Sequence, residues 1–182
     1  MKALKTALIS ILIAVCIGIQ LTPRFANVEF TSFIVFIIGV LFGSYVGCFS
    51  GILVMFVNGF LSPWGYAGIN LPFQMVGMSV AGLVGGLYRR YLPASNYRRF
   101  CFEVSVLGAL IAFTYDLVTN FGFAVQLTYG FPSSILLLMI LVSGALFSLV
   151  HVVSNVIIFG ALSFPLMKAC EEFSLNGEKR LG

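Results

Sequence analysis

Residues 31–61 read TSFIVFIIGVLFGSYVGCFSGILVMFVNGFL and contain no charged side chain. A helix needs about 20 apolar residues to cross a bilayer, so this stretch is too long for one crossing and short for two. Gly43, Ser44 and Tyr45 lie near its middle, and glycine and serine are typical of turns. The stretch therefore predicts two short membrane helices, at about 31–44 and 46–61, joined by a tight turn.

The whole chain has the composition of a membrane protein. Of its 182 residues, 60% are hydrophobic and only 9% are charged, and the mean hydropathy is +1.07. These values exclude an ordinary soluble domain. We expect an all-α integral protein that crosses the cell (cytoplasmic) membrane several times and leaves no room for a soluble catalytic domain.

The basic residues predict the orientation in the membrane. Lys2 and Lys5 precede the first apolar stretch, arginines gather in 89–100, and Lys168 follows the last stretch. Short basic segments stay on the cytoplasmic side, so an even number of crossings separates each group from the next. We expect six transmembrane helices in one domain, residues 1–182, with both termini cytoplasmic. The spans are expected at about 3–22, 31–44, 46–61, 72–88, 101–124 and 144–167.

The apolar run at 132–167 is longer than one untilted helix requires. It opens with Pro132 and Ser133, and a proline commonly marks a helix boundary. We therefore expect a separate segment at 132–143, non-crossing or re-entrant, before the last span.

Two polar pairs with the same spacing interrupt the last two spans, namely Asp116 with Asn120 and His151 with Asn155. Residues four apart share one face of a helix, so each pair projects as a unit. An ionisable group in a membrane helix is costly, at roughly 2.5–3.5 kcal/mol for a central Asp, and usually faces the bundle interior or a substrate path. The pairs predict a binding site, and a purely structural contact between helices is the alternative.

Further candidate residues lie where the spans are expected to end on the outer side. Asn27 and Glu29 belong to the 22–30 connection, and Gln74 opens the fourth span. Trp64 could stack on a planar ligand or anchor the chain at the membrane interface, and Tyr115 could contact a ring.

Several classes of function lack the residues that they require. The net charge of +4 comes from basic residues spread along segments that flank apolar stretches, which disfavours nucleic acid as a partner. Four scattered cysteines without a CxxC motif and a single histidine give no metal site and no cofactor site. The sequence also has no Walker-type phosphate loop, so any ATP hydrolysis would belong to a partner chain, and we predict no catalytic residues.

A family resemblance adds specific expectations. With Ala3-xxx-Ala7 on the first helix, a short second and third helix around 40–47 and a basic cytoplasmic loop, the chain resembles the substrate-binding S component of energy-coupling factor (ECF) vitamin transporters. The resemblance implies that Ala3 and Ala7 pack on a transmembrane coupling subunit, that two ATPase subunits complete the importer, and that a vitamin or similar micronutrient is captured from outside. The residues that would line the pocket by position are Asn27, Glu29, Gln74, Asp116, Asn120, His151 and Asn155, with Trp64 and Tyr115 as ring contacts.

Two other functions stay open at this point. The chain could be a non-transport membrane scaffold of the cell-shape type, whose polar residues only join helices. It could also be an intramembrane enzyme with Asp116 and His151 as an acid/base pair, which requires the two side chains to lie within hydrogen-bond reach of each other or of one substrate.

Overall fold

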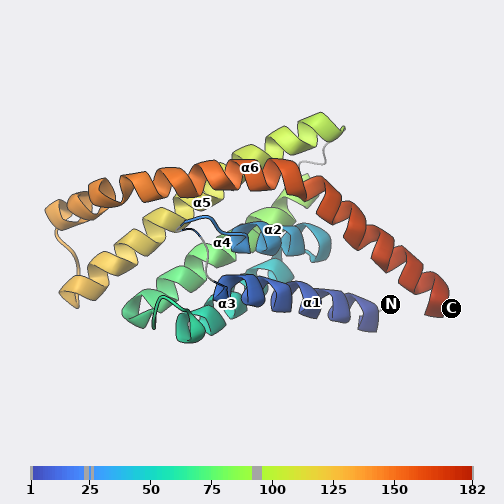
Figure 1. The fold of residues 1–182 in the computed structure, drawn as a ribbon, viewed down its shortest axis with the longest axis horizontal. Helices are drawn as coiled ribbons and strands as arrows, with labels where there is room; N and C mark the ends of the chain where they lie inside the picture. The colour runs from blue at the N-terminus through green and yellow to red at the C-terminus, as the bar shows by residue number, and fades with distance from the viewer. Residues whose placement is uncertain (1, 23–24, 26, 92–95, 182) are drawn as a thin grey trace.

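The computed structural model describes residues 2–22, 25, 27–91 and 96–181, and in these ranges the chain is a bundle of helices without strands (Figure 1). The elements are α1 (Lys2–Leu21), α2 (Thr31–Phe42), α3 (Ser44–Leu61), the short 3-10 helix η1 (Gly68–Asn70), α4 (Leu71–Tyr91), α5 (Tyr97–Thr128) and α6 (Ser134–Leu181). The all-helical class predicted from composition is confirmed.

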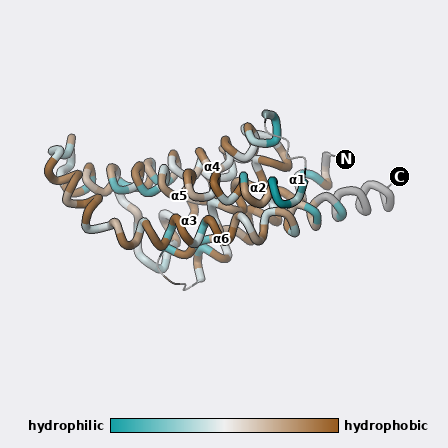
Figure 2. Tube along the Cα trace, turned by 90° about the horizontal axis from the view of Figure 1, so that it is seen from above, coloured by the Kyte–Doolittle hydropathy of each residue, from teal (hydrophilic) through white to brown (hydrophobic). Residues whose placement is uncertain are grey.

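Among the described residues, five helical segments are long and apolar enough to cross a membrane, and α2 is a shorter apolar helix. Apolar residues, coloured brown, occur on the helices along the whole bundle (Figure 2). Large apolar side chains point outward from it, such as Phe102 and Leu110 on α5 and Leu146 on α6. A soluble protein rarely exposes such a surface, whereas lipid covers it without cost. The fold is that of a multi-pass membrane protein.

The sequence places the turn between the two short helices correctly. α2 ends at Phe42 and α3 begins at Ser44, with Gly43 alone between them at φ +97°. This backbone angle is strained for a residue with a Cβ atom, so glycine is required at the turn.

The separate segment predicted at 132–143 is wrong. Residues 134–143 are the first turns of α6, which runs without interruption from Ser134 to Leu181. The Ser133 hydroxyl accepts a hydrogen bond from the amide of Leu136 at 3.3 Å, so the proline–serine pair starts the helix and does not break it. α6 bends along its length in Figure 1, and Pro165, which lies inside the helix, removes one backbone hydrogen bond.

Helix α2 forms the centre of the bundle. Its residues 31–40 are all buried, and it packs against α1, α3, α4 and α6. The rings of Phe33 and Phe36 lie 5.6 Å and 5.2 Å from the ring of Phe159 on α6. The shortest of the α-helices is therefore surrounded by protein, although its sequence alone resembles a lipid-facing span.

Glycines bring α2, α3 and α4 into backbone contact. A Cβ atom added to Gly82 on α4 would lie 2.1 Å from the carbonyl carbon of Gly47 on α3, and one added to Gly39 on α2 would lie 2.1 Å from the carbonyl oxygen of Gly82. Backbones approach this closely in membrane bundles only where side chains are absent. These three helices thus form one tightly packed unit.

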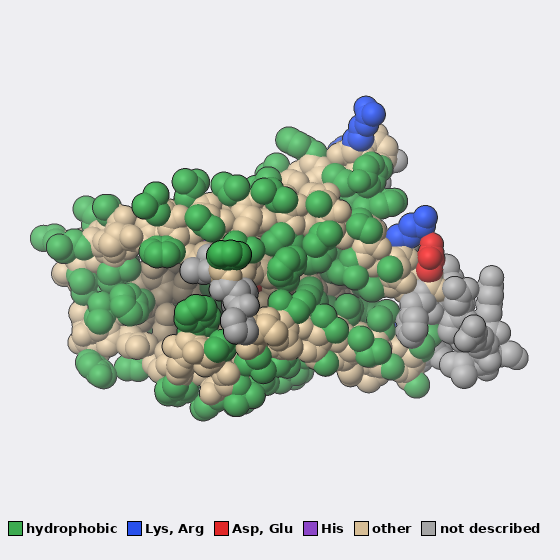
Figure 3. Space-filling view, viewed as in Figure 1, with side chains coloured by type: hydrophobic (Ala, Val, Ile, Leu, Met, Phe, Trp, Pro, Cys, Tyr) green, Lys and Arg blue, Asp and Glu red, His purple; other side chains and the backbone are tan. Residues whose placement is uncertain are grey.

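The two ends of the bundle differ. α1 begins, α6 ends, and α4 meets α5 at the same end (Figure 1). In Figure 3 the charged side chains that are visible gather at this end. The connections that lead from α1 to α2 and from α3 to α4 lie away from it (Figure 1).

The glycine contacts predict that alanine substitutions at Gly82 and at Gly18 have different effects on stability. Gly82→Ala should destabilise the protein by at least about 1–3 kcal/mol, because its Cβ meets backbone that cannot rotate away. Gly18→Ala on α1 is the matched control, since its Cβ meets nothing within 4 Å and alanine favours a helix. Thermal unfolding of the purified proteins in detergent measures both, and equal melting temperatures would contradict the backbone contact.

Candidate functional site

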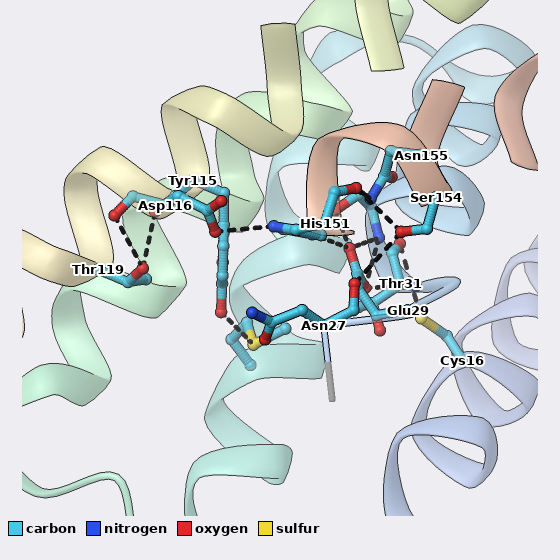
Figure 4. Close-up of polar contacts among 12 residues, drawn as sticks. Cys16, Asn27, Glu29, Thr31, Tyr115, Asp116, Thr119, His151, Ser154 and Asn155 are labelled. Atoms are coloured by element: carbon cyan, nitrogen blue, oxygen red, sulfur yellow. Dashed lines mark hydrogen bonds and ion pairs between the residues drawn. The ribbon is translucent and has the colours of Figure 1, made fainter. Parts of the chain in front are cut away.

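A histidine between two carboxylates connects three separate parts of the chain (Figure 4). His151 on α6 has its Nδ1 atom 2.7 Å from Oδ1 of Asp116 on α5 and its Nε2 atom 3.3 Å from Oε1 of Glu29. Only 4%, 14% and 9% of the three side chains, in that order, are exposed. Since both ring nitrogens face carboxylate oxygens, the geometry favours a doubly protonated imidazole that donates to both acids.

Glu29 is also bound by the start of α2. Its Oε2 atom accepts hydrogen bonds from the amide of Thr31 at 2.7 Å and from the amide of Ser32 at 3.2 Å, and its Oε1 atom accepts one from the Ser32 hydroxyl. The amides at a helix N-terminus are otherwise unpaired and carry partial positive charge. The carboxylate of Glu29 is therefore stabilised from two sides, by the helix and by the imidazole.

Asn27, shortly before α2, is also bonded to α6 through its backbone. The Ser154 hydroxyl donates to the carbonyl of Asn27 at 3.2 Å. One residue on, the Asn155 amide donates to the carbonyl of His151 at 3.0 Å. The Asn155 side chain is completely buried, and its bond stabilises the helical turn that begins at His151.

A cavity of about 480 Å³ lies beside this network. Its walls come from α1, α3, α4, α5 and α6 and from the connections before α2 and before η1. The lining residues are Gln20, Asn27, Glu29, Met55, Asn58, Gly59, Ser62, Trp64, Gly65, Tyr66, Ala67, Gln74, Met78, Tyr115, Asp116, Thr119, Asn120, Gly144, Phe147, Ser148 and His151. A volume of this size is typical of sites for small organic molecules.

The structure brings together nearly all the predicted binding residues. Those that line the cavity are Asn27, Glu29, Trp64, Gln74, Tyr115, Asp116, Asn120 and His151. Asn155 does not, because it points toward the backbone of its own helix and not into the space. The two polar pairs therefore contribute three side chains to the cavity.

Several lining residues were not among the predicted ones. Gln20 ends a buried face of α1 that runs through Leu8, Leu12 and Cys16. A polar residue in register with an apolar helical stripe was the available signal. Thr119 and Ser148 gave no signal, because hydroxyl side chains are common in membrane helices.

Aromatic side chains differ between the mouth and the interior of the cavity. Trp64 and Tyr66 belong to the connection after α3 and are 70% and 63% exposed. Tyr115 lies deeper, with its ring 5.9 Å from that of His151 in an edge arrangement and its hydroxyl donating to the Met55 sulfur at 3.7 Å. Flat surfaces are thus present at two depths.

Three buried acceptor atoms of the described cavity residues lack a donor. Oδ2 of Asp116, Oε1 of Gln74 and Oδ1 of Asn58 are buried and accept no hydrogen bond within the described structure. A buried acceptor without a donor costs about 1–3 kcal/mol, so a bound molecule that donates to these atoms would relieve the cost. Within the described ranges, no group of three His, Cys, Asp or Glu side chains is arranged to hold a metal ion.

Comparisons with protein families, with curated proteins and with solved structures gave no match to this chain.

The buried network predicts that His151 is more important for stability than its neighbours. His151→Gln should destabilise the protein by about 3–5 kcal/mol, because two buried carboxylates then lose their shared cation. Adding Asp116→Asn to this variant should restore part of the stability, since one of the two uncompensated charges is removed. Thermal unfolding measures both, and a double variant less stable than His151→Gln would contradict the ion-pair assignment.

Proposed function

We propose that this chain is the substrate-binding S component of an ECF-type importer, which captures a vitamin or similar micronutrient and delivers it inward with an ATPase module. The observation that carries the proposal is the cavity of about 480 Å³, lined by polar and aromatic side chains inside an apolar helical bundle. Sites for small organic molecules combine such a concave space with a few convergent polar groups, as this cavity does.

The orientation of the cavity supports this function. Its lining residues come from the end of α1 and α3, the start of α4, the second half of α5 and the first half of α6. All of these lie away from the end with the chain termini and the arginines near 89–100. With six membrane-crossing helices and that basic end in the cytoplasm, the cavity opens to the outside of the cell membrane.

The partner surface of the proposal is the exposed face of α1. Ala3 and Ala7 are exposed, whereas Leu8 and Leu12 pack into the core. Two small residues one turn apart let another helix approach closely in lipid. In the proposal, this face binds the coupling subunit, and two ATPase subunits supply the energy.

One observation bears on the enzyme alternative. Asp116 and His151 are in contact at 2.7 Å, which meets the distance that acid/base chemistry needs. However, the second ring nitrogen of His151 is bound to Glu29, so no nitrogen is left to exchange a proton with a substrate. A scaffold function, in turn, gives no role to the polar cavity.

Affinity capture of the tagged protein from its native membrane tests the proposal. We expect a coupling membrane protein and two ATPases to be captured, with mass spectrometry as the readout. Capture of envelope-assembly proteins without ATPases would instead favour the scaffold.

Substitutions on α1 make the same test specific to a surface. Ala3→Leu with Ala7→Leu should abolish capture of the ATPases, because bulky side chains separate the helices. Ala145→Leu, at an exposed alanine on α6, is the matched control and should leave capture unchanged. Equal capture by both variants would exclude the Ala3 and Ala7 face as the interface.

A further inference from the structure

The charge inside the cavity restricts what it can bind. Glu29 and Asp116 are acidic, and His151 between them is the one basic side chain among the described lining residues. With the imidazole doubly protonated, the three groups together carry one negative charge. Since both ring nitrogens already donate to carboxylates, His151 has no N–H left for a ligand.

The cavity should therefore bind an anionic ligand weakly. A carboxylate or phosphate in this space would lie near two carboxylates, and in surroundings of low polarity like charges repel strongly. No lysine or arginine is present among the described lining residues to offset that repulsion.

In the described part of the chain, three acceptor atoms of the cavity residues remain without a donor. Oδ2 of Asp116 is the acceptor that carries the most negative charge, and Oε1 of Gln74 and Oδ1 of Asn58 are further acceptors from two other helices. A hydrogen bond from an N–H group to a carboxylate is stronger than one to a neutral acceptor. At the mouth, the exposed rings of Trp64 and Tyr66 offer faces on which a flat, electron-poor or cationic ring can stack.

The geometry points to a neutral or cationic ring compound with N–H donors as the substrate, bound through Asp116 Oδ2, and not to a carboxylate or a phosphate ester. This inference rests on the proposed transport function and names the chemical class of its cargo.

Binding of a panel of ring compounds to the purified full chain tests it. Thiamine is the cationic probe; nicotinamide, riboflavin, adenine and guanine are neutral with N–H donors; nicotinate, biotin and folate are anionic. Nicotinamide and nicotinate form a matched pair that differs in charge on the same ring. We expect one or more of the cationic or neutral probes to raise the melting temperature and to bind in calorimetry, and the anionic probes to do neither.

Variants connect the binding to Asp116. Asp116→Asn should weaken the bound probe about tenfold or more, because a charge-assisted hydrogen bond is lost. Glu103→Gln is the matched control, since it removes the same charge from the same helix at a position bonded to Tyr88 and Arg99, and it should change affinity less than about twofold. If Asp116→Asn does not fold, Gln74→Met replaces it, with a smaller loss expected.

The outcomes separate this inference from the function on which it rests. An anionic probe that binds in the cavity, including one whose binding depends on Arg24, which lies outside the described residues, overturns the inference while leaving an importer subunit intact. Failure of every cationic and neutral probe also overturns it. Absence of ATPases from the affinity capture contradicts the transport function itself, whichever probe binds.

Discussion

The bundle depends on a buried chain of charges, in which one imidazole lies between two carboxylates. His151 bonds Asp116 on the neighbouring helix and Glu29 on a connection that is 122 residues away in sequence. Removing His151 leaves two carboxylates without their shared cation, in surroundings that hydrate them poorly. The network therefore fixes α5, α6 and the start of α2 relative to one another, and the cavity lies against it.

The length of α2 explains how Glu29 reaches this network. α2 has 12 residues and so is about 18 Å long, well short of the roughly 30 Å of a hydrocarbon core. The connection before it must consequently descend into the bundle, where its polar backbone and side chains need partners. The amides of Thr31 and Ser32, the imidazole of His151 and the hydroxyl of Ser154 provide them.

Local features of the sequence were sufficient for the helices, but not for all of their boundaries or contacts. The glycine at 43 marks a turn because its backbone angle excludes other residues. The four-residue spacing within the pairs Asp116/Asn120 and His151/Asn155 predicts helix faces that meet, and Asp116 and His151 are indeed in contact. Pro132 was ambiguous, because a proline precedes helices as readily as it ends them. The contact of Glu29 with His151 follows from the packing of α2, which no periodicity encodes, and Asn155 shares a helix face with His151 but is held by its own backbone.

The burial of α2 also bears on how the chain is inserted during synthesis. A helix of 12 residues that follows shortly after Glu29 is too short to cross the lipid bilayer stably on its own. Its ten consecutive buried residues find their proper surroundings only after α3 and α4 are present, because Gly39 contacts the backbone of α4. Insertion of the nascent protein is thus cooperative, since α2 reaches its buried position only when it packs against helices that are synthesised after it.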